Sequence, residues 1–355
     1  MEPSLHPSND AAQHGPRPLP LFLSMLRSET AANPSRRAAA LRGLSAYQDA
    51  PRPPRSRAMP AVKQAGRACL RDYGGEGSPV VFVPSLINPP FVLDLAPGSS
   101  LLRWLAERGH HVLLVDWGSP SPADRGMDIA THVTDLLLPM LRTLPQPPVL
   151  VGYCLGGTMA LAAAQLLPAA GLALLAAPWR FAGFGQPARD QIAGLWARSA
   201  PSCDALGLVP MEVLQSGFWS LDPARTIAKY ERFATLDPAS DAAAAFIALE
   251  DWANAGAPLP LAAGRDLFER FIGADHPGSG EWEISGQRID PAALSCPTLD
   301  IASASDRIVP LATAARVPGF QEVAAGHVGM IVGRGARRDV WGPLDRWLSG
   351  LAAIK

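Results

Sequence analysis

Charged residues are scarce in this sequence, and their two signs nearly cancel. They make up 18% of the 355 residues, and 31 Lys and Arg stand against 32 Asp and Glu, for a net charge of −1. A nucleic-acid-binding domain needs a strongly basic surface or stripe, so this composition argues against nucleic acid as a partner. Apolar residues, by contrast, reach 48%, which is enough for a sizeable buried core.

Cysteine is equally sparse. The four residues of this type are far apart in the chain, at Cys69, Cys154, Cys203 and Cys296. They form no C-x-x-C pair and show no metal-site spacing with histidine. Isolated thiols of this kind are typical of a reducing compartment. We therefore expect a cytoplasmic protein with free thiols and no metal site.

The sequence also lacks a recognisable export signal and a long apolar run. Its first residues carry no basic cluster, and the first apolar stretch, residues 19–26, is short and broken. The most apolar later stretch, residues 160–177, is interrupted by Gln165, Pro168 and Gly171. A membrane-spanning helix needs about 20 consecutive apolar residues. We expect a soluble protein without a transmembrane segment.

Composition divides the chain near residue 60. Residues 1–18 are polar and proline-bearing, which predicts disorder. Residues 21–47 predict one or two helices, and the PRPPR segment at residues 51–55 is typical of an extended linker. The remaining residues, 61–355, are expected to form one large domain.

Beyond this division, short apolar runs alternate with helical stretches. The runs suit strands that are buried on both faces, as in a parallel sheet. The alternation predicts an α/β fold with a doubly wound, mostly parallel sheet. Strands are expected at 68–73 (an edge strand), 79–83, 110–115, 148–153, 172–176, 297–302 and 320–324. Helices are expected at 99–108, 126–144, 336–351 and between the fourth and fifth strands, ending near residue 167.

The alternation stops between residues 179 and 285. This stretch has no strand-like apolar run, but it has helical stretches at 188–200, 211–219, 223–233 and 242–252. Sheets of this type commonly carry a helical insertion at this point of the chain. We therefore predict a helical cap over about residues 179–285.

One predicted strand runs into Gly152-Tyr153-Cys154-Leu155-Gly156-Gly157, and a helix follows. This pattern is typical of a nucleophile elbow, a strained turn on which small residues flank the nucleophile. The N-terminus of the following helix favours a thiolate over a thiol. Cys154 is therefore the candidate nucleophile. The plainer alternative is a buried, inert cysteine in a glycine-rich turn.

A nucleophile of this kind needs a base, and the base needs an acid that orients it. In α/β-hydrolases the acid and then the base follow the nucleophile, in loops after late strands. Asp306 and His327 follow the last two predicted strands in this order, whereas Asp300 lies within a strand. The remaining histidines lie in the tail, before the nucleophile or in the insertion, at His6, His14, His110, His111, His132 and His276.

Acyl transfer also needs hydrogen-bond donors for the oxyanion of the intermediate. The backbone N–H of Leu155, directly after the nucleophile, is the first candidate. A second donor is expected in the loop after the first long buried strand, residues 84–90. There the backbone N–H of Ile87 or Leu86, or the side chain of Asn88, could serve. An ordinary strand-to-helix turn is the alternative.

Several segments together resemble the polyhydroxyalkanoate synthases. The most distinctive are the G-x-C-x-G-G box around Cys154, Asp306-Arg307-Ile308-Val309-Pro310 and Gly326-His327-Val328-Gly329, in this order. Further matching segments are Val115-Asp116-Trp117-Gly118, Ile87-Asn88 and Leu93-Asp94-Leu95. The resemblance extends from about residue 73 to residue 351 and implies an α/β-hydrolase fold. The overall length is similar to that of the shorter synthases, which work with a separate partner subunit.

The resemblance implies an acyltransferase that polymerises (R)-3-hydroxyacyl-CoA with release of CoA. Cys154 would hold the growing chain as a thioester, His327 would generate the thiolate, and Asp306 would orient His327. Trp252 resembles a tryptophan in the helical cap of these enzymes. No cofactor is implied besides the CoA thioester substrate. The implied partners are the polyester chain, a partner subunit or a second copy, and the surface of a polyester granule in the cytoplasm.

Two other interpretations stay open. One is a cysteine-type hydrolase, either an intracellular polyhydroxyalkanoate depolymerase or an acyl-CoA thioesterase. The other is a non-catalytic granule-associated protein, against which a complete Cys-Asp-His set argues. A thiolate exchanges one thioester for another with little change in energy, so the acyl-enzyme stays reactive toward a hydroxyl group. This chemistry favours transfer over hydrolysis, provided that water is excluded.

Overall fold

The computed structural model describes residues 14–52 and 58–353. The chain divides into two compact units, one made of Met1–Arg55 with Asp222–Asn254 and the other of Ser56–Leu221 with Ala255–Lys355. Most of the predicted disordered tail and the end of the predicted linker lie outside the described residues. The division near residue 55 lies close to the predicted one, but part of the predicted cap groups with the N-terminal residues.

The larger unit is built on one eight-stranded sheet with the strand order β1-β2-β6-β3-β7-β8-β13-β14. All neighbouring strands from β6 to β14 are parallel, and β2 is antiparallel to both of its neighbours. This confirms the predicted mostly parallel sheet. The strands are β1 (Ala61–Ala65), β2 (Ala68–Asp72), β3 (Glu76–Val83), β6 (His110–Asp116), β7 (Val149–Tyr153), β8 (Gly171–Leu175), β13 (Thr298–Ser303) and β14 (Phe320–Val323).

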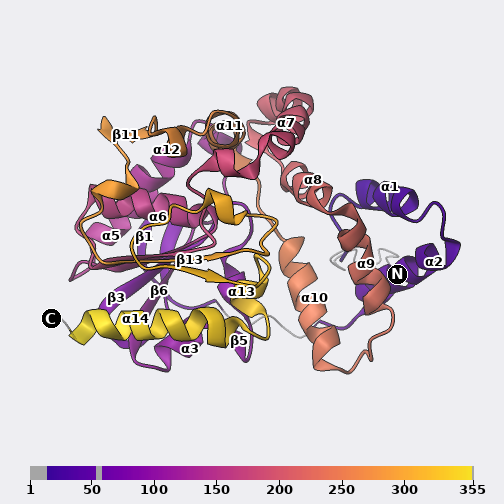
Figure 1. Cartoon of the computed structure of the whole chain (residues 1–355), viewed down its shortest axis with the longest axis horizontal. Coiled ribbons are helices and arrows are strands. Elements are labelled where there is room, and N and C mark those ends of the chain that lie inside the picture. Colours follow the sequence, from indigo (N-terminus) through magenta and orange to yellow (C-terminus); the bar gives the residue numbers. More distant parts are fainter. Residues whose placement is uncertain (1–13, 53–57, 354–355) are drawn as a thin grey trace, which may run out of the picture. The chain divides into compact units, whose positions relative to one another are not determined.

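Helices cover both faces of this sheet (Figure 1). The helices α5 (Leu138–Arg142) and α6 (Leu155–Leu166) lie on one face, and α3 (Leu101–Ala106) and α14 (Gly342–Ala353) lie on the other. Ten of the twelve residues of α6 are buried, since its sequence LGGTMALAAAQL has no charged residue to keep in water. In the described part of the chain, no helix combines the length and the apolar character needed to cross a membrane.

The edge of the sheet differs from the prediction. Strand β2, expected at the edge, lies between β1 and β6, and β1 is the edge strand. The sequence of β1 is AVKQA, and it is largely exposed, so it lacks the apolar run by which the other strands were predicted. Polar side chains such as Lys63 and Gln64 suit an edge strand, because they discourage pairing with another chain.

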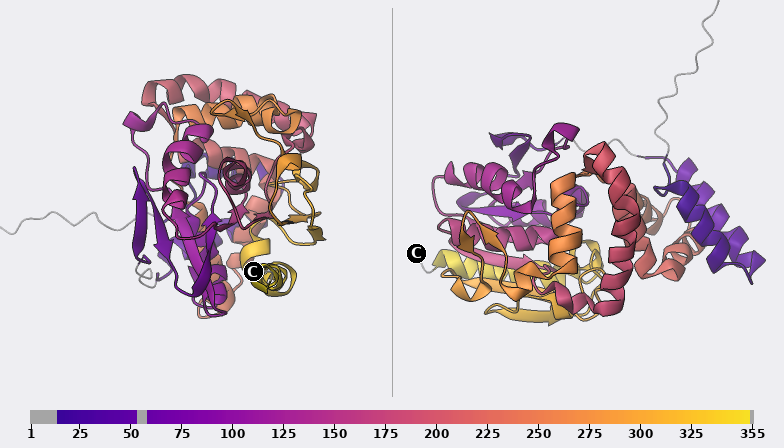
Figure 2. Two further views of the ribbon diagram at one scale, coloured as in Figure 1. Left: turned by 90° about the vertical axis from the view of Figure 1, so that its left-hand side faces the viewer. Right: turned by 90° about the horizontal axis from the view of Figure 1, so that it is seen from above.

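The segment predicted as a cap is helical, but its helices belong to different units. The helices α7 (Gln186–Leu206) and α8 (Met211–Leu221) belong to the larger unit, and α9 (Pro223–Phe233) and α10 (Asp241–Ala253) belong to the smaller one. In the larger unit, α7 runs beside the π-helical segment Asp266–Gly273 (Figure 2). There the rings of Trp196 and Phe268 stack with their centroids 4.9 Å apart.

The same segment and the residues just after it also contain four short strands that the sequence did not predict. Strand β9 (Leu208–Val209) pairs with β10 (Leu259–Pro260), and β11 (Glu283–Ile284) pairs with β12 (Gln287–Arg288). Each is only two residues long, which is too short to leave a period-2 pattern of apolar residues.

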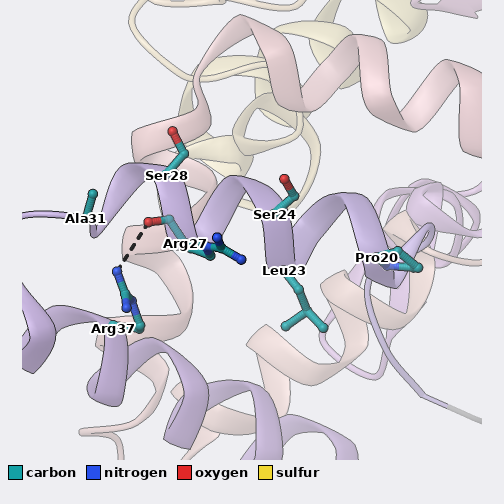
Figure 3. Close-up of a pocket in the computed structure, with 7 residues that line it drawn as sticks. All are labelled: Pro20, Leu23, Ser24, Arg27, Ser28, Ala31 and Arg37. Atoms are coloured by element: carbon teal, nitrogen blue, oxygen red, sulfur yellow. Dashed lines mark hydrogen bonds between the residues drawn. The ribbon is translucent and has the colours of Figure 1, made fainter.

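The smaller unit contains α1 (Leu19–Glu29) and α2 (Pro34–Asp49) together with α9 and α10. Residues 21–47, for which one or two helices were expected, lie in two helices, and the Asn33 side chain caps the second by accepting the N–H of Arg36 at 3.1 Å. Arg37 of α2 in turn donates to the backbone oxygen of Arg27 on α1 (Figure 3).

Aromatic rings hold the helices of the smaller unit together. Phe22 of α1 and Tyr47 of α2 both pack edge-on against Tyr230 of α9, with ring centroids 5.0 and 6.1 Å away. Tyr47 also donates its hydroxyl to Asp251 of α10 at 2.6 Å. Tyr230 donates to Glu250 at 2.8 Å, so these buried hydroxyls are paired.

A fully buried histidine ties the start of β2 to the helical layer of the larger unit. His132 Nδ1 donates to the backbone oxygen of Asp128 at 2.6 Å. Its Nε2 lies 2.6 Å from Nη2 of Arg67. A guanidinium group only donates, so Nε2 accepts and the imidazole is neutral. Burial is the main cause that lowers the pKa of His132 to about 4.

This arrangement makes stability depend on pH. In the unfolded chain the pKa of a histidine is about 6.5. Between pH 6.5 and pH 4, the unfolded state therefore binds the proton more strongly than the folded state does. The contribution of neutral His132, up to about 3 kcal/mol, is complete above pH 6.5 and is lost as the pH falls to about 4. Urea unfolding should show this loss in the wild type but a smaller one in His132→Gln. An equal pH dependence in both proteins would contradict the assignment.

Candidate active site

Cys154 occupies a strained turn between β7 and α6. Its backbone has φ +56° and ψ −135°, a region that residues with a side chain rarely adopt. The turn is held by the sheet, because the N–H of Cys154 donates to Leu175 of β8 at 3.0 Å. The turn also places the cysteine at the N-terminus of α6, where the helix dipole favours a negative charge. This is the geometry of the predicted nucleophile elbow.

Three glycines let the elbow close. A Cβ atom on Gly152 would lie 2.3 Å from the Cα of Gly157, and one on Gly157 would lie 2.2 Å from the Cβ of Ala177. A Cβ on Gly156 would lie 2.1 Å from the backbone oxygen of Val83. No larger residue fits at these positions unless the backbone moves. The first turn of α6 is therefore packed directly against the ends of β3 and β7 and against the chain that follows β8.

Asp306 and His327 come together as the sequence predicts. His327 Nδ1 lies 2.7 Å from Asp306 Oδ2, and only 7% and 5% of these two residues are exposed. The other carboxylate oxygen of Asp306 accepts the backbone N–H groups of Ile308 and Val309 at 2.8 and 2.9 Å. The carboxylate therefore has three donors in fixed positions, and it can orient the imidazole.

The electrostatic surroundings of His327 link it to Cys154. Burial lowers the pKa of the imidazole, but Coulomb attraction and hydrogen bonds with Cys154 and Asp306 outweigh burial and raise this pKa to about 10. A proton on the imidazole is thus stabilised from both sides, by the sulfur and by the carboxylate. The three side chains form a connected Cys-His-Asp arrangement.

Tyr153, which the sequence did not mark as a site residue, packs against the imidazole of His327. Its ring stacks on the imidazole of His327, with centroids 5.1 Å apart and an angle of 24° between the planes. Its hydroxyl donates to the backbone oxygen of His327 at 3.4 Å. Burial, with the nearby Cys154 and Asp306, raises the pKa of the phenol, so the hydroxyl keeps its proton. The residue lies next to Cys154 in the chain, but its contact with His327 depends on tertiary structure.

The loop after β3 lies beside the elbow, where the second oxyanion donor is expected. Trp117 Nε1 donates to the backbone oxygen of Pro84 at 3.0 Å and holds this loop in place. The N–H of Leu155 is free of intrahelical bonds, because this residue begins α6. The N–H of Ile87, however, donates to Ser85 Oγ at 3.1 Å. The oxyanion role of Ile87 stays a prediction, and it requires exchange of that hydrogen bond.

The rival acid and base candidates are engaged elsewhere. Asp300 is buried within β13 and accepts the N–H of Arg316 at 2.8 Å. Among the histidines, His110 and His111 lie near Asp345 and Asp72, His132 is bound by Arg67, His276 lies near Glu281 and His14 near Asp251. His6 lies outside the described residues.

The described residues also bear on metal binding. Within residues 14–52 and 58–353, no three His, Cys, Asp or Glu side chains are grouped so that they could hold a metal ion. The site itself offers a thiol, an imidazole and a carboxylate.

Comparisons with known proteins identify the family of the chain. The sequence profile of the alpha/beta hydrolase family matches residues 80–337. The poly(3-hydroxyalkanoate) polymerase subunit PhaC of Haloferax mediterranei is 29% identical over 287 residues, which are 76% of this chain. That of Allochromatium vinosum is 28% identical over 294 residues, covering 76% of this chain and 80% of the relative. The predicted resemblance to polyhydroxyalkanoate synthases is thereby confirmed.

The match covers only part of the Haloferax protein, since this chain spans 58% of the length of that relative. Among solved structures, a lipase-like protein from Sulfolobus solfataricus superposes with a TM-score of 0.49 and 15% sequence identity. The superposition covers 83% of this chain and 98% of that one.

The close packing of the elbow can be tested with one methyl group. Gly156→Ala should lower the free energy of unfolding by about 1–3 kcal/mol, as is typical of overpacking, because its Cβ meets the backbone at Val83 and Pro84. Gly350→Ala is the matched control in α14, where no atom lies within 4 Å of the added methyl group. It should be neutral or stabilising. Similar unfolding curves for both variants would show that the elbow is not tightly packed.

Proposed function

The chain belongs to the alpha/beta hydrolase family, and we propose that it acts within this family as a polyhydroxyalkanoate synthase-like acyltransferase. Its substrate is an (R)-3-hydroxyacyl-CoA, and its products are a polyester and free CoA. The observation that carries the proposal is the cysteine at the elbow, connected through His327 to a buried Asp306. The relatives named polymerase subunits support the same chemistry.

In the first half of the proposed reaction, the Cys154 thiolate attacks the carbonyl carbon of the CoA thioester. The carbon–sulfur bond to CoA breaks, and the CoA sulfur takes a proton from the His327 imidazolium. The acyl group is left on Cys154 as a new thioester. Asp306 keeps the imidazole in the tautomer and orientation that this transfer needs. The N–H of Leu155 is placed to stabilise the oxyanion.

In the second half, the hydroxyl group of the acceptor attacks the thioester on Cys154. His327, now neutral, accepts the hydroxyl proton, an ester forms, and the Cys154 thiolate is released. A thioester is a better acyl donor than an oxygen ester, so ester formation proceeds downhill. This is the physical reason to keep a cysteine at an elbow where hydrolases of this fold carry a serine.

The cellular location of the enzyme and its partners are part of the same proposal. We place it in the cytoplasm at the surface of polyester granules, since the product is an insoluble chain. It works there with a partner subunit or as a pair of identical chains. Neither nucleic acid nor a cofactor takes part in the reaction.

The reaction type can be decided with the purified full chain and (R)-3-hydroxybutyryl-CoA. CoA release with accumulation of polymer is the expected result. Accumulation of free acid would replace the proposal by a thioesterase, and release of acid from preformed polyester would replace it by a depolymerase. Absence of turnover with both substrates, also after a synthase partner subunit is supplied, would contradict an enzymatic role.

The nucleophile has its own test. Cys154→Ala should abolish CoA release, because it removes the sulfur that accepts the acyl chain in the proposed reaction. Cys69→Ala is the matched control, since Cys69 is a free thiol on β2, which β6 and β3 separate from β7 in the sheet. Labelling with a radioactive acyl-CoA should mark the wild type and Cys69→Ala, but not Cys154→Ala. Label on Cys154→Ala would refute the assignment.

Tyr153 is proposed as a positioning residue for His327. Tyr153→Phe keeps the stacked ring and should retain most of the activity. Tyr153→Leu loses the ring and should lower kcat about tenfold or more, as misplacement of a catalytic group does, with little change in KM. NMR titration should also show a changed pKa of His327 in Tyr153→Leu. Equal kcat values and equal titrations for the two variants would exclude this role.

A further inference from the structure

Three arginines surround a cavity in the larger unit that the triad does not use. The cavity has a volume of about 420 Å³, within the range of small-molecule sites. Arg180 follows β8, Arg288 lies in β12, and Arg316 precedes β14. Neither Cys154, Asp306 nor His327 lines this cavity.

All three arginines are exposed, and the guanidinium groups of Arg180 and Arg316 are held by contacts with other residues. Arg180 donates to the backbone oxygen of Ala314 at 2.9 Å. The guanidinium of Arg288 lies against Gly280, so closely that a Cβ at Gly280 would be 2.0 Å from Nη2. The guanidinium of Arg316 lies over the ring of Phe320, 4.7 Å from its centroid. Side chains that are already ordered lose little entropy when they bind a ligand.

The backbone of Arg316 adopts an unfavourable conformation. Its φ is +56°, a left-handed conformation that costs free energy in a residue with a side chain. Its N–H donates to Asp300 Oδ2 at 2.8 Å, and Asp300 is fully buried. The other oxygen of this carboxylate, Oδ1, has no hydrogen-bond partner among the described residues. A buried carboxylate is thus used to fix the arginine at the wall of the cavity.

The positive charges at the cavity are not neutralised by ion pairs. Within the described part of the chain, none of the three arginines forms a salt bridge. Asp290 also lines the cavity, but its Oδ1 accepts the N–H of Ala292. The buried carboxylate of Asp300, which is bonded to the lining residue Arg316, offsets part of the positive charge of the arginines. A net positive charge remains, and guanidinium forks are well suited to phosphate oxygens.

We propose that this cavity binds a phosphate-bearing ligand, a diphosphate or a phosphate monoester, through Arg180, Arg288 and Arg316. The phosphate could be free or could belong to the adenosine end of a CoA molecule. The second source rests on the proposed function, in which CoA is released; the chain beside the cavity is tied to the helix that begins after Cys154, because the backbone oxygen of Pro178 accepts the hydroxyl of Thr158 at 2.6 Å. Thr158 lies one turn after Cys154 in α6.

The test is a calorimetric titration of the full chain with four probes: inorganic pyrophosphate, adenosine 3′,5′-bisphosphate, CoA and pantetheine. The first three carry phosphate and should bind, whereas pantetheine should not. Affinity should fall as salt is added, because the contacts are between charges near the surface. Binding of pyrophosphate much stronger than that of CoA would identify a free phosphate as the ligand, and the reverse would identify CoA. Absence of binding by all phosphate probes would overturn the proposal.

Variants locate the binding. Arg288→Gln and Arg316→Gln should each weaken binding about tenfold or more, the usual loss for a hydrogen bond to a charged group. Arg142→Gln is the matched control, since Arg142 is exposed and lies at the end of α5, outside the cavity. Thermal unfolding of all three variants checks the fold. An equal loss in Arg142→Gln, or no loss in Arg288→Gln, would place the anion elsewhere. Because pyrophosphate is neither a substrate nor a product of the proposed acyl transfer, its binding tests the cavity independently of that reaction.

Discussion

The left-handed turn at Cys154 is the constraint on which the site depends. The parallel sheet stabilises it, because its hydrogen-bond ladder continues beyond the strand ends. The N–H of Cys154 donates to Leu175, and the N–H of Ala176, which is also left-handed at φ +47°, donates to Ile301. Two adjacent strands are thus each followed by a residue with a positive φ, and each of these residues is tied to the next strand. The glycines around Cys154 then let α6 begin directly against the strand ends, which aims the sulfur away from the sheet.

The base and the acid depend on the same end of the sheet. His327 and Asp306 follow neighbouring parallel strands, so their loops emerge side by side. Ser303, the last residue of β13, joins these loops by accepting the N–H of Ala325 at 3.1 Å. Tyr153 adds a packing contact from the nucleophile strand to the imidazole. The nucleophile strand and the two loops that carry Asp306 and His327 are therefore joined to one another by direct contacts.

The sequence predicted those features that local chemistry dictates. Apolar runs predicted the inner strands, and the Gly152, Gly156 and Cys154 pattern predicted the elbow. The edge strand β1 was missed because an exposed strand carries no apolar run. The stacking of Tyr153 on His327 joins residues 174 positions apart, so no local pattern contains it. The cavity arginines, at positions 180, 288 and 316, are scattered in the chain for the same reason, and only the fold brings them together.

Cys154, His327 and Asp306 do not by themselves determine whether a hydroxyl group or water is the acceptor. His327 and Asp306 are almost completely buried, whereas Cys154 is only partly buried. Any acceptor must therefore approach from the side of the sulfur. In the proposed reaction, the same imidazole could take a proton from a water molecule or from a 3-hydroxyl group, and a thioester is reactive toward both. What separates a transferase from a hydrolase on this fold is consequently the surface that faces Cys154 and its ability to exclude water, and not the identity of the acid or the base.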